Sequence, residues 1–163
     1  MKYSEEEGLR WHNSLPTKRV ASSVLFRNSD GKVLIVKPNY RDYWNFPGGV
    51  VESNESPLDG AIRETKEEIG ILISPATLTF LAVDYGPKQA SGKNDILSID
   101  FDGGILSDSQ IDNIIIQAEE LDEYRFVDES ELGTFLKPEK AKRIYNALKS
   151  KTAIYLENGE YRT

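Results

Sequence analysis

Apolar residues recur along the chain in short runs that predict β-strands, separated by segments rich in glycine, proline and small polar residues. Residues 32–37, KVLIVK, predict a strand whose continuous apolar run is typical of burial on both faces. The turn sequence NSDG at 28–31 joins this run to the one before it, so we expect a hairpin. The other expected strands lie at 18–27, 78–85, 96–101, 124–127 and 152–156.

Two longer segments have the 3.6-residue periodicity of amphipathic helices. The first begins at Pro57 with Ser56 as its N-cap and ends before Gly70, a residue suited to the left-handed conformation after a last turn. The second spans 138–149, and a short helix is expected over 107–113. Strands in hairpins mixed with two principal helices indicate an α+β fold or a mixed-sheet sandwich, and periodicity does not choose between them.

The length of 163 residues suits one domain with a single core. We expect residues 1–17 to be an N-terminal arm or irregular lead-in and residues 18–163 to form the domain. Trp11 is the residue in the arm that we expect to hold it against the domain.

The composition of the chain narrows the classes of protein to which it can belong. The 39% hydrophobic and 29% charged residues are typical of a soluble globular protein. The absence of cysteine excludes disulfides and cysteine nucleophiles, and the single histidine, His12, has no partner that suggests a ligand site. A net charge of −7 argues against general nucleic-acid binding. With no apolar run long enough for a membrane span and no signal sequence, a cytoplasmic location is the default expectation.

Acidic residues on the first long helix indicate a metal site. Glu64, Glu67 and Glu68 stand at i, i+3 and i+4, which places like charges together on one side of the helix. Because that repulsion opposes folding, a divalent cation is the natural neutralising partner, and carboxylates are ligands that Mg²⁺ and Mn²⁺ prefer. Gly48 and Gly49 precede the helix and would let the backbone approach an ion or phosphate closely.

The same stretch carries a specific resemblance. Residues 49–71 match the pattern G-x5-E-x7-R-E-U-x-E-E-x-G-U, where U is a bulky aliphatic residue, with Thr65 as the one soft departure. The chain therefore resembles the Nudix hydrolase family, which acts on nucleoside diphosphates linked to another group. The resemblance implies an α/β fold, an α/β/α sandwich around a mixed sheet, and Mg²⁺-dependent hydrolysis of a phosphoanhydride, with Mn²⁺ as an alternative metal.

The resemblance also implies roles by position. Glu67 and Glu68 are the strongest expected metal ligands, followed by Glu64 and the carbonyl of Gly49, while Arg63 is expected to orient the glutamates. The general base varies in the family. Glu120 stands six residues before Phe126, a spacing that resembles several family members, so it ranks first, ahead of Glu123 and Glu119. Glu64 or Glu68 stays open as the base.

The substrate is less constrained by the sequence. Tyr40, Trp44 and Tyr85 are candidates to stack on a nucleobase, and Arg41 is a candidate to bind phosphate. ADP-ribose or another nucleotide sugar competes with nucleoside triphosphates and dinucleoside polyphosphates. The alternative function is a non-catalytic nucleotide-binding module. A homodimer is expected only from the habits of the family that the chain resembles.

Overall fold

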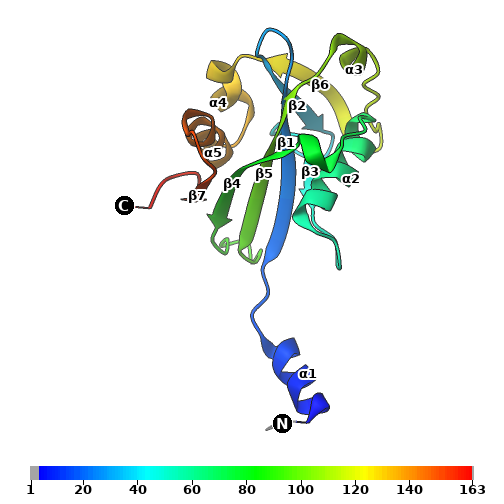
Figure 1. Cartoon of the computed structure of the whole chain (residues 1–163). Helices are drawn as coiled ribbons and strands as arrows, with labels where there is room; N and C mark the ends of the chain where they lie inside the picture. The colour runs from blue at the N-terminus through cyan, green and yellow to red at the C-terminus, as the bar shows by residue number, and fades with distance from the viewer. Residues whose placement is uncertain (1–3, 163) are drawn as a thin grey trace.

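The apolar runs become the strands of a seven-stranded mixed sheet in the computed structural model, which describes residues 4–162 (Figure 1). The strand order is β6-β2-β1-β5-β4-β7, with β3 paired to β1 beside this path. The pairs β1–β5 and β4–β7 are parallel, and the other pairs are antiparallel. The strands are β1 Arg19–Arg27, β2 Val33–Pro38, β3 Gly48–Val50, β4 Thr79–Gly86, β5 Ile96–Ile105, β6 Leu121–Val127 and β7 Ile154–Glu157.

The expected strands are confirmed, although the two strands of the first hairpin pair only beside the turn. β1 and β2 pair at Arg27 and Val33, after which the two strands diverge. Beyond that point β2 pairs with β6, while the first half of β1 pairs with the short β3. No strand was expected at Gly48 and Gly49, where β3 lies. The divergence of β1 and β2 brings the double glycine beside β1.

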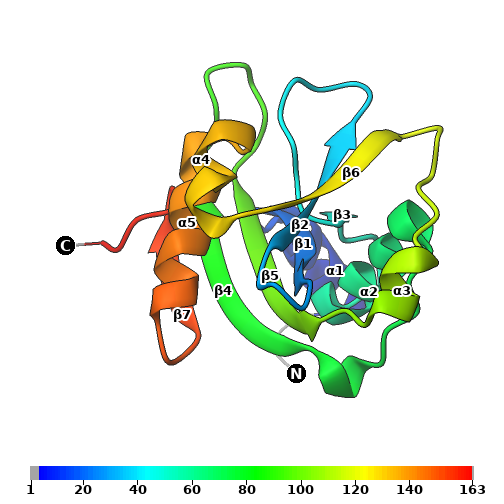
Figure 2. The same cartoon turned by 90° about the horizontal axis from the view of Figure 1, so that it is seen from above.

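Of the five helices in the described part of the chain, four lie against the sheet, on its two faces. The helices are α1 Glu5–Ser14, α2 Pro57–Ile69, α3 Asp108–Asp112, α4 Leu132–Phe135 and α5 Pro138–Lys149, with single 3-10 turns at Pro75–Thr77 and Glu129–Glu131. Viewed from above, α4 and α5 lie on one side of the sheet and α2 and α3 on the other (Figure 2). This arrangement confirms the expected α/β/α sandwich. Within residues 4–162, none of the helices has the length and apolarity needed to cross a membrane.

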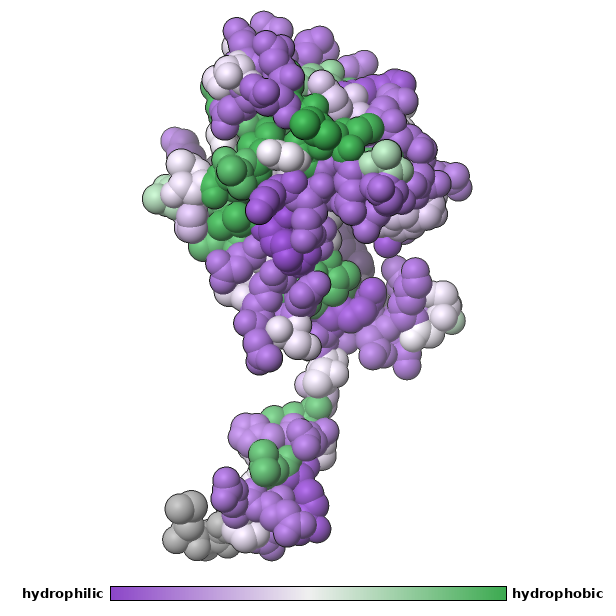
Figure 3. Space-filling view, turned by 90° about the vertical axis from the view of Figure 1, so that its right-hand side faces the viewer, coloured by the Kyte–Doolittle hydropathy of each residue, from purple (hydrophilic) through white to green (hydrophobic). Residues whose placement is uncertain are grey.

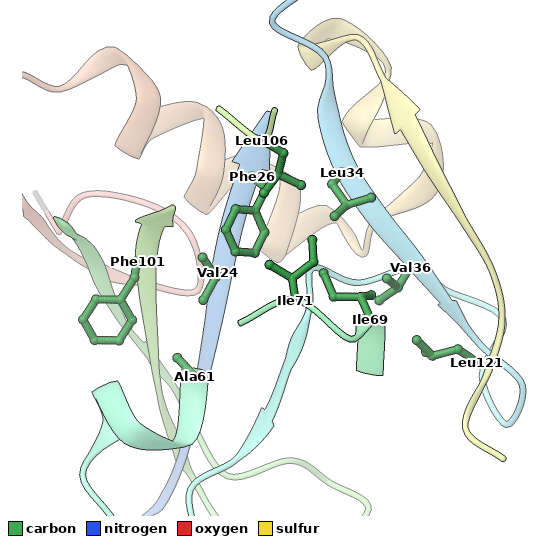
Figure 4. Close-up of a cluster of buried hydrophobic side chains, with 10 residues drawn as sticks. All are labelled: Val24, Phe26, Leu34, Val36, Ala61, Ile69, Ile71, Phe101, Leu106 and Leu121. Atoms are coloured by element: carbon green, nitrogen blue, oxygen red, sulfur yellow. The ribbon is translucent and has the colours of Figure 1, made fainter. Parts of the chain in front are cut away.

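Alternation along the central strands builds two apolar layers. Val24 and Phe26 of β1 pack with Ile69 on the α2 side (Figure 4), whereas Leu25 packs with Ile144 on the α5 side. The apolar side chains of β2 alternate between the same two layers. Its first four residues are buried, as expected for a strand covered on both faces.

The helix α2 has the ends that its sequence predicts. The Ser56 hydroxyl accepts a bond from the backbone N–H of Asp59, Pro57 starts the helix, and Gly70 ends it with φ of 74°. Thr65 is buried and donates its hydroxyl to the Ala61 carbonyl at 2.7 Å, so it fits the aliphatic position of the motif without an unpaired polar atom.

The N-terminal arm differs from expectation. Instead of an irregular lead-in, residues 5–14 form α1, which begins with a capping box between Ser4 and Glu7 and has no buried residue. The helix stands clear of the body of the protein (Figures 1 and 3). Trp11 is 60% exposed, so the expectation that it holds the arm against the domain is wrong.

Candidate active site

Arg63 organises the acidic residues of the motif. Its guanidinium donates two bonds to the Glu55 carboxylate, at 2.8 and 3.0 Å, in the paired geometry that suits arginine and carboxylate. Its Nη1 also donates to Glu64 Oε1 at 3.0 Å and to Glu67 Oε2 at 2.9 Å. The bonds from Arg63 to the Glu55 carboxylate lower the pKa of Glu55 to about 2. Glu55 and Arg63 thus form a fixed pair on which the glutamates of α2 are held.

The double glycine lets two α2 carboxylates reach the sheet. The backbone N–H of Gly48 donates to Glu68 Oε2 at 2.8 Å. A Cβ at position 49 would lie 2.3 Å from Glu64 Oε1, and a Cβ at position 48 would lie 2.3 Å from the Ser22 carbonyl oxygen. Glycine is required at position 48 because the clash there is with backbone, whereas a side chain at position 49 would displace the carboxylate of Glu64.

Glu68 is more buried than its place in an acidic triplet suggested. It is 7% exposed, although the spacing had placed it with Glu64 and Glu67 on the charged side of the helix. Burial raises the pKa of Glu68 to about 7, and the charges of Glu64 and Glu120 add to the effect. Burial also raises the pKa of Glu64, with Glu67 and Glu120 contributing. The three carboxylates of Glu64, Glu68 and Glu120 therefore repel one another across a small space.

That crowding fits a divalent cation chemically, because only a cation relieves it and all three groups offer oxygen ligands. In the described range 4–162, no three acidic or histidine side chains already converge in metal-binding geometry. Glu64 and Glu67 turn toward Arg63, and Glu68 turns toward Gly48. The residues that would hold the cation are Glu64, Glu68 and the Gly49 carbonyl, with Glu67 at the exposed margin.

A cavity of about 500 Å³ lies beside these carboxylates. Of the residues predicted to act there, it is lined by Gly49, Glu64, Glu68, Glu120, Tyr40 and Arg41. Tyr40 is 62% exposed and has the Arg41 guanidinium 5.0 Å from its ring centre, so both stand at the mouth.

The structure places the other two aromatic candidates away from the cavity wall. Trp44 is 8% exposed and packs edge-on against Phe135, with ring centres 5.6 Å apart. Tyr85 donates its hydroxyl to Asp95 at 3.2 Å. Trp44 therefore lies in the core and Tyr85 in a neighbouring polar contact.

The structure separates the candidate bases. Glu120 is exposed and lines the cavity, in a turn that Asn39 holds by donating its backbone N–H to the Glu120 carbonyl at 2.9 Å. The Asn39 side chain also donates to the Glu119 carbonyl at 2.8 Å. Glu123 is paired instead with Arg125, whose guanidinium lies 4.9 Å from the centre of the Trp44 ring. Glu120 is therefore the candidate base that faces the carboxylates of α2.

Sequence reasoning missed a polar network on the opposite wall. Arg143 of α5 is buried and pairs with Asp84 of β4 at 3.2 Å and with Asp100 of β5 at 2.6 Å. Asp100 also accepts a bond from the Ser23 hydroxyl at 2.5 Å. The sequence could have revealed this network through Asp84 and Asp100, which interrupt the apolar runs of β4 and β5. A charged residue buried in a strand needs a partner of opposite charge.

Comparison with known proteins agrees with this geometry. The sequence model of the NUDIX domain matches residues 17–149, most of the chain. The chain belongs to the NUDIX family. The resemblance expected from the motif is therefore confirmed at the level of the whole domain.

Individual relatives of this NUDIX chain match over shorter stretches. An RNA pyrophosphohydrolase from Halorhodospira halophila is 41% identical over 58 residues, which cover 36% of this chain and 31% of that protein. The uncharacterized Nudix hydrolase YvcI from Bacillus subtilis is 42% identical over 71 residues, covering 41% and 44% of the two chains. The chain thus matches less than half the length of either relative.

Solved structures show the same fold. The MutT protein from Methanosarcina mazei superposes with a TM-score of 0.66 at 23% identity, over 84% of this chain and all of that one. The mixed sheet with helices on both faces is therefore the NUDIX fold.

Proposed function

We propose that this chain is a Mg²⁺-dependent pyrophosphohydrolase that hydrolyses the phosphoanhydride of a nucleoside diphosphate derivative. The observation that carries the proposal is the convergence of Glu64, Glu68, Glu120 and Gly49 on one cavity, with Arg63 behind them. A divalent cation bound there supplies charge neutralisation for the diphosphate and lowers the pKa of a bound water.

The residues of the chain have distinct roles in this reaction. Glu64, Glu68 and the Gly49 carbonyl would hold the cation, and Arg63 keeps Glu64 in place through its fixed pair with Glu55. Glu120 accepts a proton from the attacking water. The water oxygen forms a bond to one phosphorus, the bridging oxygen leaves with the other phosphate, and two phosphate-terminated products result.

The mouth of the cavity suits the nucleotide portion of the substrate. Tyr40 offers an exposed aromatic face, and Arg41 offers a cation for a phosphate or a stacked base. A small nucleotide enters such a cavity without a large basic surface, in keeping with the net charge of −7. Manganese is an alternative metal for the same oxygen ligands.

A substrate panel tests the proposal. Purified protein with Mg²⁺ or Mn²⁺ is incubated with ADP-ribose, a nucleotide sugar, nucleoside triphosphates, a dinucleoside polyphosphate and RNA bearing a 5′-triphosphate. The last is included because one relative is named an RNA pyrophosphohydrolase. Metal-dependent release of a nucleoside monophosphate, or of pyrophosphate from RNA, is expected with at least one substrate. Tight nucleotide binding with background turnover for every substrate would favour the non-catalytic binding module instead.

A further inference from the structure

The wall of the cavity opposite the glutamates carries a cation that the proposed chemistry has not used. Lys140 and Arg143 of α5 both line this wall. Arg143 is neutralised by its ion pairs with Asp84 and Asp100. Lys140 differs, because no carboxylate of residues 4–162 forms an ion pair with its ammonium group.

The position of the Lys140 ammonium is fixed by neutral groups. Its Nζ donates to Asn45 Oδ1 at 3.1 Å and lies 5.1 Å from the centre of the Phe46 ring. Asn45 is itself fixed to β2, because it exchanges two backbone bonds with Val36, at 2.8 and 2.9 Å. The ammonium is thus held in place by neutral groups, with Asp100 and Glu68 near enough to favour its charge but not in ion-pair contact with it.

Lys140 is partly buried. Removing an ammonium from water without a counter-ion in contact is costly, and side chains in that state are usually paired or functional. Burial lowers the pKa of Lys140 to about 8, so the group still carries its charge at pH 7. Lys140 and Glu68 influence each other's pKa, although they form no ion pair. The space between α5 and the glutamates therefore has a cation on one wall and carboxylates on the other.

We propose that Lys140 is a substrate-binding residue that donates a hydrogen bond to a non-bridging phosphate oxygen of the diphosphate, on the α5 side of the cavity. This inference rests on the proposed function for the identity of the ligand. Substrate phosphate then supplies the direct ionic contact that no carboxylate of residues 4–162 makes with Lys140. The diphosphate lies between two positive partners, the cation on the glutamates and the ammonium of Lys140.

The test uses Lys140→Met, which keeps an unbranched side chain of similar length beside Phe46 and removes the charge together with the bond to Asn45. Lys142→Met is the matched control, because Lys142 lies on the same helix, is 55% exposed and pairs with Glu160 outside the cavity. Binding of inorganic pyrophosphate with Mg²⁺ is measured by calorimetry, and steady-state kinetics are measured on the substrate found by the panel.

Lys140→Met is expected to weaken pyrophosphate binding and raise KM by at least about tenfold, the size of a lost charge-assisted hydrogen bond, with a smaller change in kcat. Lys140→Arg should restore part of the loss, and Lys142→Met should match the unmodified protein. Unchanged pyrophosphate affinity in Lys140→Met would overturn the inference, and so would an equal loss in Lys142→Met. Thermal unfolding of each variant shows whether the fold is intact.

The outcomes separate this inference from the proposed function. If the unmodified protein hydrolyses a diphosphate but Lys140→Met behaves like it, only the role of Lys140 is wrong. If no substrate is turned over while pyrophosphate binding still depends on Lys140, the phosphate site stands and the hydrolase proposal fails.

Discussion

Replacing Glu68 with glutamine should make the metal-free protein more stable while abolishing most of its activity. Glu68 is buried against Gly48, and glutamine has nearly the same shape and can still accept the Gly48 N–H bond. The substitution therefore removes the charge and little else. Its effect on stability and its effect on turnover have opposite signs.

The expected stability gain follows from the pKa. Burial raises the pKa of Glu68 from 4.5 to about 7, so the folded state binds this proton more tightly than the unfolded chain does. Stability from this group is fully present below pH 4.5 and is lost as pH rises to 7. At about 1.4 kcal/mol per tenfold change in proton affinity, the penalty above pH 7 reaches about 3 kcal/mol. Glu68→Gln should therefore gain about 1–3 kcal/mol at pH 8.

Urea unfolding in EDTA at pH 8 and at pH 4 measures the gain, which should be present at pH 8 and nearly absent at pH 4. Glu67→Gln is the control, because Glu67 is half exposed and should change stability by less than about 1 kcal/mol. With Mg²⁺ present, Glu68→Gln should lower turnover at least about a hundredfold, equal to about 2.7 kcal/mol of transition-state stabilisation. A Glu68→Gln protein that is less stable at pH 8 without metal would refute the burial argument, and a fully active one would refute the site.

Three further predictions test other parts of the structure. Glu120→Gln should lower kcat at least about a hundredfold while Glu119→Gln stays near the unmodified rate, and equal rates for both would remove Glu120 as the base. Ile144→Ala should lower the free energy of unfolding by about 2–5 kcal/mol in urea, because the side chain is fully buried; a loss under 1 kcal/mol would contradict the packing described. Arg63 lowers the pKa of Glu55 to about 2, so its stabilisation is present above pH 4.5 and is lost as pH falls toward 2. Glu55→Gln should therefore be less stable than the unmodified protein at pH 7, with a difference that shrinks as pH falls below 4.5, and a constant difference would argue against the pair.

Local features of the fold were readable from the sequence. Ser56, Pro57 and Gly70 mark the ends of α2 because capping depends on residues within one turn of each end. The continuous run in β2 indicated burial on both faces, since the four successive positions from Val33 to Val36 are all apolar. The helix in the N-terminal arm was missed, although Ser4 and Glu7 have the spacing of a capping box.

Part of the candidate site was also readable from the sequence, and part of it was not. The sequence by itself determined the motif of Gly49, Arg63 and the glutamates, because these residues lie within a turn and a helix whose geometry is local. Only the tertiary structure decided which distant residues join them. Glu120 lines the cavity and Glu123 does not. Lys140 lines the opposite wall, although it follows the last glutamate of α2 by 72 positions in the sequence. Successive strand residues point to opposite faces, and helix α5 reaches the cavity only by packing across the sheet, so no local pattern fixes these contacts.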